Sequence, residues 1–479
     1  MTAIDRHALS PYRYSNTNIT MKVEVLVLLL VLRYGSPFIL QPSTAPNRRR
    51  IVSLQQLSST WQSHVSTYPD ARSALNKVLD DLDRSKSADL AFLFVAQFHA
   101  AQFEALVQQA SARLPDACRL VSVVGGGVIG DNIELDEPSK PGLSLLVGSI
   151  PNGLDDVEIF YFNELAQPPP PPESDYWSSL CSRDESIPSS FLIFADPWSP
   201  VEHLVEALGS SSIIAGGMSV STGTGPTLAI DSDAKKQGSV VGVCFKRSLK
   251  VQVVVAQGCR PIGPTYTITS TEGNFILELD SRPAIRVLEE YLSSIESKAE
   301  QNAVSSGLVC GIQAKNTDED YLIRQMLGFL PAKGGIAVGG IIQAGEKLRF
   351  HVRDKAAANE DLNLMVQRAK TERMFSDCKG TPVAALQISC IARGREFFGV
   401  PNADLSRIKG LLEGGPVAGF FANGEIGPVG IAGITSTPDS GTYLHGFTTV
   451  VALLCDMGPS SREDDGSSTS IGEQADVWG

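Results

Sequence analysis

The sequence predicts a mixed α/β protein with two domains, in which mixed β-sheets are flanked by helices. Two observations support this class. An order of strand, helix, strand and glycine recurs three times along the chain, and short buried-strand runs alternate with stretches of helical spacing, as in α/β folds. The chain has 479 residues, of which 43% are hydrophobic and 19% charged, so it is long enough for two or three domains of about 100–200 residues each.

The first recurrence begins with the apolar run Leu90–Val95, which is typical of a buried strand. Ala100–Leu114 follows, and its apolar residues Phe103, Leu106, Val107 and Ala110 have the spacing of one helix face. A second strand is expected at Leu120–Val124, before three glycines at 125–127. We therefore expect a strand, a helix and a second strand in this order.

The second recurrence consists of a strand at Phe191–Ala195, a helix at Pro200–Leu208 with proline near its start, and a strand at Ile213–Ala215. Gly216 and Gly217 follow.

The third recurrence consists of a strand at Val383–Ala392, a helix at Asn402–Leu412, and a strand at Val417–Phe421 before residues 423–425. A further strand is expected after each glycine cluster, at Leu143–Ile150, Ser239–Phe245 and Thr448–Leu454.

These patterns predict a first domain at residues 75–247, with a proline-rich insertion at 166–190, and a second domain at 250–456. Residues 457–479 are rich in Ser, Gly and acidic residues, which is typical of a disordered tail.

Residues 1–50 are basic and contain the apolar run Val23–Leu32, which is half of what a bilayer span needs. The segment resembles a leader for an organelle, and its order of features resembles the presequences of some algal plastids. We expect no transmembrane span in the mature protein. The alternative is a mispredicted start with no targeting role, which would leave the protein in the cytoplasm.

Charge and metal-ligand patterns exclude several classes of protein. The formal net charge is −13, and no basic stripe is present, which argues against nucleic-acid binding. The eight cysteines form no C-x-x-C pair and the six histidines are scattered, so we expect no metal site. We also expect no cofactor.

Residues Gly125–Gly130 match the G-x-G-x-x-G pattern of dinucleotide sites, which requires a helix after the last glycine. The residues that follow, 131–138, are acidic and end in proline, and their carboxylates would repel a phosphate. We therefore expect these glycines to form a turn with close backbone approach.

Cys390 is the thiol with the strongest case for chemistry, because Arg393 and Arg395 lie nearby and would lower its pKa. A nucleophilic cysteine also needs a base, and His445 and His351 are the candidates. The alternative, a buried structural thiol, is the one we favour, so we assign no catalytic residue.

Two polar clusters follow expected strands: Arg393-Gly394-Arg395, and Asn423-Gly424-Glu425. Ligand crevices in open α/β sheets form at strand ends. The guanidinium of Arg393 suits a carboxylate and Glu425 suits an amino group, which predicts a pocket for an amino-acid-like ligand. The residues of this predicted site are Cys390, Arg393, Asn423, Gly424 and Glu425. The alternative is that Arg393 and Glu425 pair with each other.

The chain resembles the FIST family, whose members carry an N-terminal and a C-terminal FIST domain. The resemblance covers residues 75–456. It is carried by VVGGGVIGDNIELDE, PGLSLLVGSI, SIIAGGMS, GSVVGVCF, VVVAQGCRPIGPTYTIT and, most clearly, ISCIARGREFFG…PVAGFFANGEIGP…YLHGFTTVVALL. The chain is also similar to the FIST region of F-box only protein 22.

The resemblance implies a sensory protein that binds a small ligand, with amino acids proposed, and that signals through a protein partner. One alternative is a substrate receptor of a ubiquitin ligase. Residues 51–87 lack the pattern of an F-box and instead predict one or two short amphipathic helices. The second alternative is a thiol enzyme that uses Cys390. We expect a non-catalytic sensor.

Overall fold

The computed structural model describes residues 60–163, 169–171, 174–180, 189–208, 212–223, 225–315, 320–376, 380–434 and 441–458. All of these belong to one compact unit, residues 57–479. The predicted leader and most of the predicted tail lie outside the described residues.

The first sheet contains six strands in the order β1-β6-β2-β3-β10-β11. The strands are β1 (Trp61–Ser66), β6 (Leu143–Gly148), β2 (Leu90–Ala96), β3 (Arg119–Gly125), β10 (Leu228–Ile230) and β11 (Asp233–Lys235). The central strand β2 is parallel to β3 and antiparallel to β6. Every residue of β2 is buried, because it has neighbours on both sides and is covered on both faces.

Two helices, α2 (Ala71–Asp80) and α3 (Phe103–Arg113), cover the outer face of this sheet. The four residues of α3 that are buried are the four with helical spacing in the sequence, so the predicted face is confirmed. Helix α2 begins at the capping residue Asp70, whose carboxylate accepts the N–H of Ser73.

The second sheet has the order β25-β23-β9-β8-β12-β7. Its strands are β25 (Thr442–His445), β23 (Glu425–Pro428), β9 (Ile213–Met218), β8 (Ser190–Ala195), β12 (Ser239–Phe245) and β7 (Val157–Asn163). The central strand β8 is again parallel to one neighbour, β9, and antiparallel to the other, β12. Helices α4 (Asp175–Leu180) and α5 (Val201–Leu208) pack on its outer face.

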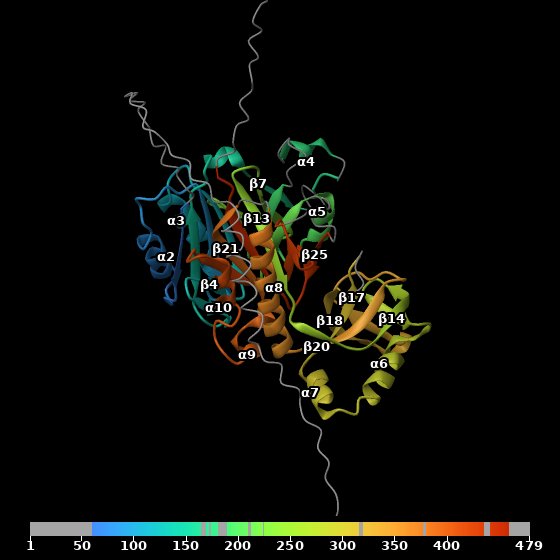
Figure 1. Ribbon diagram of the computed structural model, residues 1–479. Helices are drawn as coiled ribbons and strands as arrows, with labels where there is room; N and C mark the ends of the chain where they lie inside the picture. Colours follow the sequence, from blue (N-terminus) through green and yellow to red (C-terminus); the bar gives the residue numbers. More distant parts are fainter. Residues whose placement is uncertain are drawn as a thin grey trace, which may run out of the picture. The chain divides into compact units, whose positions relative to one another are not determined.

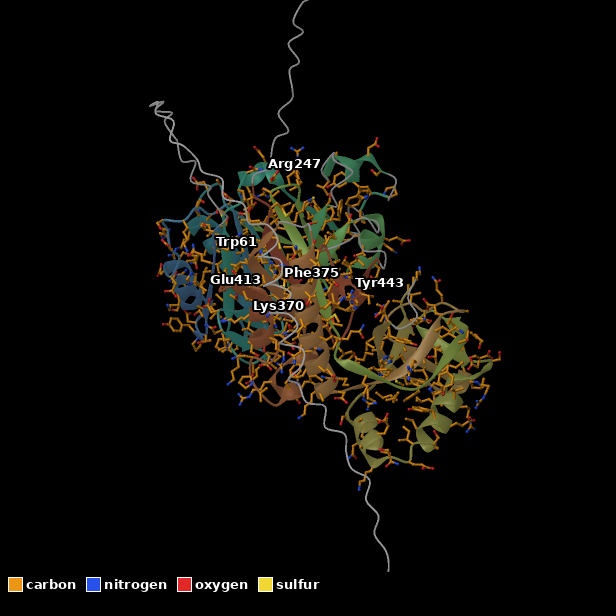
Figure 2. The ribbon with its side chains drawn as sticks, viewed as in Figure 1. Trp61, Arg247, Lys370, Phe375, Glu413 and Tyr443 are labelled. Atoms are coloured by element: carbon orange, nitrogen blue, oxygen red, sulfur yellow. The ribbon has the colours of Figure 1, made fainter. Side chains whose placement is uncertain are left out.

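The third sheet has the order β24-β13-β26-β21-β22-β4-β5. Its strands are β24 (Ile431–Ala432), β13 (Leu249–Ala256), β26 (Thr449–Asp456), β21 (Thr381–Cys390), β22 (Val417–Ala422), β4 (Val128–Gly130) and β5 (Ile133–Leu135). The central strand β21 is parallel to β22 and antiparallel to β26. Its outer face is covered by α8 (Lys355–Phe375) and α10 (Leu405–Ile408). Figure 2 labels Lys370 and Phe375 on α8, where Phe375 is 83% exposed.

The three units exchange strands with one another in a cycle. After β3, the hairpin β4–β5 leaves the first sheet and pairs with β22 of the third. After β9, the hairpin β10–β11 pairs with β3 of the first sheet. After β22, strand β23 pairs with β9 of the second. Each recurrence in the sequence therefore builds one sheet and completes another.

The inner faces of the three sheets share one core. Phe94 of β2, Phe194 of β8 and Phe420 of β22 meet there with ring-centroid distances of 5.4 Å (Phe94–Phe420), 6.1 Å (Phe194–Phe420) and 6.4 Å (Phe94–Phe194). Aromatic pairs at such distances add about 0.5–1.5 kcal/mol each beyond the area they bury.

A closed barrel of six antiparallel strands lies in the sequence between β13 and α8. Its strands pair in the ring β14-β20-β17-β18-β19-β15, which closes through β14 and β15. They are β14 (Cys259–Glu272), β20 (Lys347–Arg353), β17 (Leu308–Gln313), β18 (Tyr321–Leu330), β19 (Gly335–Val338) and β15 (Phe275–Leu279). In Figure 1 these strands form a group of their own beside α6 (Ala284–Ser293) and α7 (Lys298–Ser306).

The mixed α/β class and the threefold recurrence are confirmed, and three details of the prediction are wrong. Gly216 and Gly217 lie inside β9 and not after it. The helix expected at 402–412 is reduced to α10 and a 3₁₀ turn at Lys409–Leu411. The region 51–87 contains the strand β1 and one helix in its described part, because residues 61–66 pair with β6. The domain limits 75–247 and 250–456 stay a prediction.

The glycines at 125–130 form the turn that carries the chain from the first sheet to the third. The elements that come after Gly127 are the strands β4 and β5, and not a helix. A Cβ at Gly127 would lie 1.8 Å from the carbonyl oxygen of Leu135, so only glycine fits the close approach of the two backbones. The reading of these glycines as a turn is confirmed.

Candidate functional site

The five predicted site residues lie at the ends of two parallel neighbouring strands, as expected. Cys390 is the last residue of β21, Asn423 and Gly424 directly follow β22, and Glu425 begins β23. The side chains of Cys390, Arg393 and Glu425 lie close enough that Glu425 affects the pKa of Cys390 and the charge of Arg393 affects the pKa of both. The structure therefore brings these three together.

Arg393 does not pair with Glu425, and that alternative is wrong. Its guanidinium instead forms two hydrogen bonds with Asp404, at 2.8 Å from Nε to Oδ2 and 3.0 Å from NH2 to Oδ1. Its NH1 donates to the carbonyl oxygen of Phe447 at 3.3 Å. Burial lowers the pKa of Arg393 but Asp404 more than offsets it, so the net shift is upward and the charge is retained. The groups that would hold a ligand carboxylate are thus used by Asp404.

Glu425 is fully buried and has one oxygen engaged. Its Oε2 accepts the backbone N–H of Thr448 at 3.1 Å and the hydroxyl of the same residue at 2.7 Å. Its Oε1 has no hydrogen-bond partner among the described residues. Burial raises the pKa of Glu425 to about 8, so the carboxyl is mostly protonated at neutral pH.

The Cys390 thiol is in the wrong environment for a nucleophile. Burial, and next the carboxyl of Glu425, raise the pKa of Cys390 to about 12. The two candidate bases bond to backbone oxygens: His445 to Gly427 and His351 to Arg349, each at 2.9 Å. Burial lowers the pKa of both imidazoles to about 4, so neither is tuned to accept a proton at neutral pH.

Asn423 and Gly424 have backbone roles. The N–H of Asn423 donates to Met218 of β9, and Met218 donates back to Gly424, at 3.0 and 2.8 Å. The side chain of Asn423 is exposed. These two residues join the second and third sheets.

A cavity of about 380 Å³ lies beside this cluster, between β5 and the segment that follows Arg393. None of the five predicted residues lines it. The residues whose polar groups converge on it are Thr67, Glu134, Asp136, Glu137, Lys140, Arg395 and Asn402. Sequence reasoning identified only Arg395 of these, as a neighbour of Cys390.

The two walls of this cavity are tied together by hydrogen bonds. Asp136 accepts the backbone N–H of Arg395, and a Cβ at Gly394 would lie 2.0 Å from the Asp136 carboxylate. Across the cavity, the side-chain oxygen of Asn402 accepts the N–H of Glu134 at 2.8 Å. Asn402 has φ 57°, a left-handed conformation that asparagine tolerates better than most residues.

Glu134 connects the cavity to the buried cluster. Its Oε1 accepts from Gln387 Nε2 and from the backbone N–H of Leu405, both at 2.8 Å. Burial, and next the charge of Asp404, raise the pKa of Glu134 to about 7. A buried carboxyl with such a pKa in the wall of a cavity is a candidate for ligand binding.

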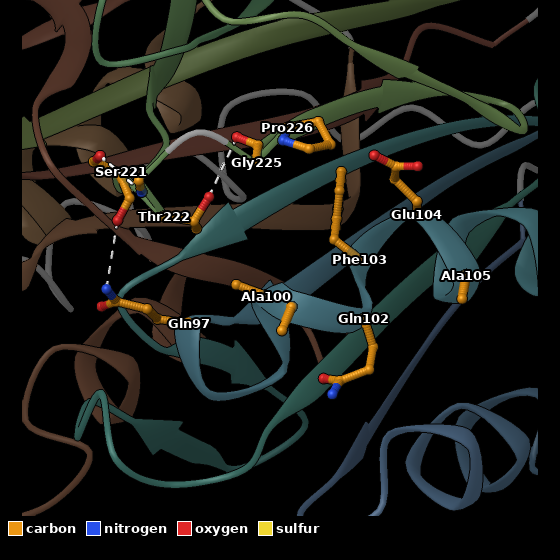
Figure 3. A pocket seen from close by; sticks show the side chains of 12 residues that line it. Gln97, Ala100, Gln102, Phe103, Glu104, Ala105, Ser221, Thr222, Gly225 and Pro226 are labelled. Atoms are coloured by element: carbon orange, nitrogen blue, oxygen red, sulfur yellow. Dashed lines mark hydrogen bonds between the residues drawn. The ribbon is translucent and has the colours of Figure 1, made fainter.

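A second cavity, of about 800 Å³, lies between the start of α3 and the loop at 221–226 (Figure 3). Gln97 donates a hydrogen bond to the carbonyl of Ser221 across one side of it. Glu104 is the one ionisable residue among the described residues that line it, whereas acidic and basic side chains together line the smaller cavity. We therefore place the candidate site at the smaller cavity.

Further features limit the chemistry of the described residues. No three His, Cys, Asp or Glu side chains among them converge as metal ligands would. No helix in the described part of the chain has both the length and the apolar character to cross a membrane.

The fold and site define a protein of recurrent α/β units with a partly open cavity that acidic and basic side chains line. The FIST N domain model matches residues 89–282, and the FIST C domain model matches residues 284–428. The chain therefore belongs to the FIST family, whose domains are generally regarded as sensory, ligand-binding modules of signal transduction.

Curated relatives cover most of the chain. Uncharacterized protein Rv0628c of Mycobacterium tuberculosis is 35% identical over 407 residues, which are 82% of this chain and 98% of that protein. Uncharacterized protein Mb0898c of Mycobacterium bovis is 34% identical over 408 residues, with the same coverage. These mycobacterial relatives give no support to a plastid location. The similarity to F-box only protein 22 stays a prediction.

Proposed function

We propose that this protein is a non-catalytic sensor that binds a small, amino-acid-like ligand in the cavity between β5 and residues 395–402. The observation that carries the proposal is that a basic and an acidic side chain, each without an ion-pair partner, line one cavity. Within the described part of the chain, the guanidinium of Arg395 has no ion-pair partner, and Glu134 has none either. A zwitterion supplies a carboxylate for the first and an ammonium group for the second.

The cluster predicted from the sequence has a supporting role in this proposal. Arg393 and Asp404 lie directly behind the cavity wall, where the buried pair fixes the segment that presents Arg395. The ligand contacts that we first assigned to Arg393 and Glu425 pass to Arg395 and Glu134. Binding sites need such a supporting shell to hold their groups in place.

A signal requires that the ligand bind two arrangements of the protein with different affinity. The barrel is the part that such a signal would reach first. Arg353, the last residue of β20, donates to the carbonyl oxygen of Ala392, and its guanidinium lies 4.7 Å from the ring centroid of Phe397 and 5.2 Å from that of Phe447. The barrel thus contacts the same segment that forms the cavity wall.

Thermal-shift screening of the full chain with amino acids and related metabolites tests the proposal. A ligand at 100 times its dissociation constant adds about 2.7 kcal/mol to the free energy of unfolding, which is a readily measured shift. We expect a compound that carries both charges to raise the melting temperature, and Arg395→Ala to abolish the shift. Arg286→Ala, which removes an arginine that is 73% exposed on α6, is the matched control. A hit that is unaffected by Arg395→Ala would place the ligand elsewhere.

A further inference from the structure

Glu134 is a buried carboxyl group without a cation beside it. The residue is 8% exposed and lies on β5, and the third sheet and the segment before α10 enclose it. A carboxylate in such a place needs a counter-charge, because burial of an unpaired charge costs several kcal/mol. The usual solution, an arginine or lysine within salt-bridge distance, is not found for Glu134 among the described residues.

The charged neighbours of Glu134 are themselves engaged or negative. Asp404, from the segment before α10, is paired with Arg393 and leaves no positive charge for Glu134. Asp136, on the same hairpin, adds a negative charge. Gln387 of β21 is neutral. Of the two cations that line the cavity, Lys140 lies 3.9 Å from Glu137, and Arg395 forms no ion pair with Glu134 within the described structure.

The two oxygens of Glu134 differ in a way that points to a ligand. Oε1 accepts two hydrogen bonds, from Gln387 and Leu405. Oε2 accepts no hydrogen bond within the described structure. It is nevertheless not one of the polar atoms that are both unpartnered and fully shielded from solvent. It therefore keeps some accessible surface, and Glu134 is one of the residues that line the cavity.

We infer that this cavity exchanges a proton for a cation: Glu134 carries the proton on Oε2 when the cavity is empty, and releases it when a ligand's ammonium group takes that position. The inference rests on the proposed function and adds its regulation. The exchange breaks one bond and forms one ion pair. The O–H bond of the Glu134 carboxyl breaks, one proton leaves to solvent, and an ion pair forms between the carboxylate and the ammonium group, which keeps all its own protons.

An organic cation fits this position better than a metal ion. Of the other carboxylates nearby, Asp136 is bound to the N–H of Arg395, Asp404 is paired with Arg393, and Glu137 lies 3.9 Å from Lys140. Ca²⁺ takes six to eight oxygen ligands, and the described residues hold no group of three acidic, His or Cys side chains. An ammonium group has three N–H donors and no fixed coordination number, and Oε2 of Glu134 has no hydrogen bond within the described structure.

The exchange makes binding depend on pH near neutrality. The pKa of Glu134 is raised to about 7, whereas an alkylammonium group keeps its proton until about pH 10. Between pH 6 and pH 8 the ionised fraction of Glu134 rises about tenfold, and the affinity for the cation rises by the same factor.

Three small probes of similar size test the exchange: n-butylammonium, 4-aminobutyrate and butyrate. We expect both ammonium compounds to bind the full chain about ten times more tightly at pH 8 than at pH 6, and butyrate to show no such gain. Titration calorimetry at pH 7 in phosphate and in Tris, whose ionisation enthalpies differ, should show release of a fraction of a proton. Glu134→Gln should remove the pH dependence and the proton release. Glu137→Gln, at a cavity carboxylate that is 52% exposed, should keep both.

A second measurement does not depend on the probes. The carboxyl ¹³C resonance of Glu134, assigned by its loss in Glu134→Gln, should titrate near pH 7 in the empty protein. A midpoint near the ordinary value of about 4.3 would overturn the exchange. So would an ammonium ligand whose affinity is equal at pH 6 and pH 8. If an amino-acid-like compound binds equally at pH 6 and pH 8 and needs Arg395, the proposed function stands and the exchange alone fails. If no compound of the panel binds at either pH, both fail.

Discussion

Arg393 and Asp404 form a two-pronged ion pair with distances of 2.8 and 3.0 Å, and their side chains are only 1% and 2% exposed. Asp404 is followed by Leu405, whose backbone N–H reaches Glu134 in the cavity wall. The pair therefore links the segment at 392–395, which Arg353 of the barrel contacts, to the residues before α10 that reach Glu134.

Removal of one partner of this pair should be strongly destabilising. We expect Asp404→Ala to lower the free energy of unfolding by about 3–5 kcal/mol, because the guanidinium of Arg393 would remain buried without a counter-charge. The double variant Arg393→Met/Asp404→Leu should recover most of that loss. Urea unfolding measures both, and a single variant as stable as the wild type would show that the pair is not formed.

Glu425 should make the protein less stable as the pH rises. Its pKa is raised from 4.5 to about 8 on folding, so the folded state holds the proton more tightly than the unfolded state. The stabilisation is complete below about pH 4.5 and is lost as the pH rises towards 8. Glu425→Gln, which mimics the protonated form, should flatten the melting temperature between pH 6 and 9 relative to wild type. An unchanged pH profile would show that Glu425 is ionised.

The thiol of Cys390 should be unreactive in the folded protein. With the pKa raised to about 12, the thiolate that attacks disulfide reagents is scarce at pH 8. We expect wild type and Cys390→Ala to release equal amounts of thionitrobenzoate from Ellman's reagent under native conditions, and to differ by one equivalent in guanidinium chloride. Fast native labelling of Cys390 would revive the thiol-enzyme alternative.

Gly127 should not accept a side chain. A Cβ there would lie 1.8 Å from the Leu135 carbonyl oxygen, so Gly127→Ala should cost about 1–3 kcal/mol by forcing β4 and β5 apart. Gly339→Ala is the control, because the nearest atom to its Cβ is 3.9 Å away. Equal stability of the two variants in thermal melts would contradict the described turn.

Much of the fold could be predicted because the central strands are buried on both faces. Leu90–Ala96 is a continuous apolar run, which is typical of a strand buried on both faces. In the helix Phe103–Arg113 the apolar residues recur at the spacing of one helix face. The barrel could not be predicted in this way. Its longest strand, Cys259–Glu272, mixes buried and exposed residues irregularly, because bulges interrupt its pairing.

The site was predicted in part, for a physical reason. Cys390, Arg393 and Glu425 meet because they follow neighbouring strands, which is a local rule. Glu134 was missed because alternation along 133–135 predicts an exposed side chain. It is buried instead by Leu405, which is 271 positions away and reaches it through the exchange of the hairpin β4–β5 between sheets. A short acidic hairpin directly after a glycine turn was the one signal available.

The measurement that tests the central claim most directly is the structure of the full chain with the first compound that raises its melting temperature in the screen. The account predicts that the compound lies between Oε2 of Glu134 and the guanidinium of Arg395, in the cavity beside Asn402. A compound found in the larger cavity at the start of α3, with Glu134 and Arg395 untouched, would contradict it.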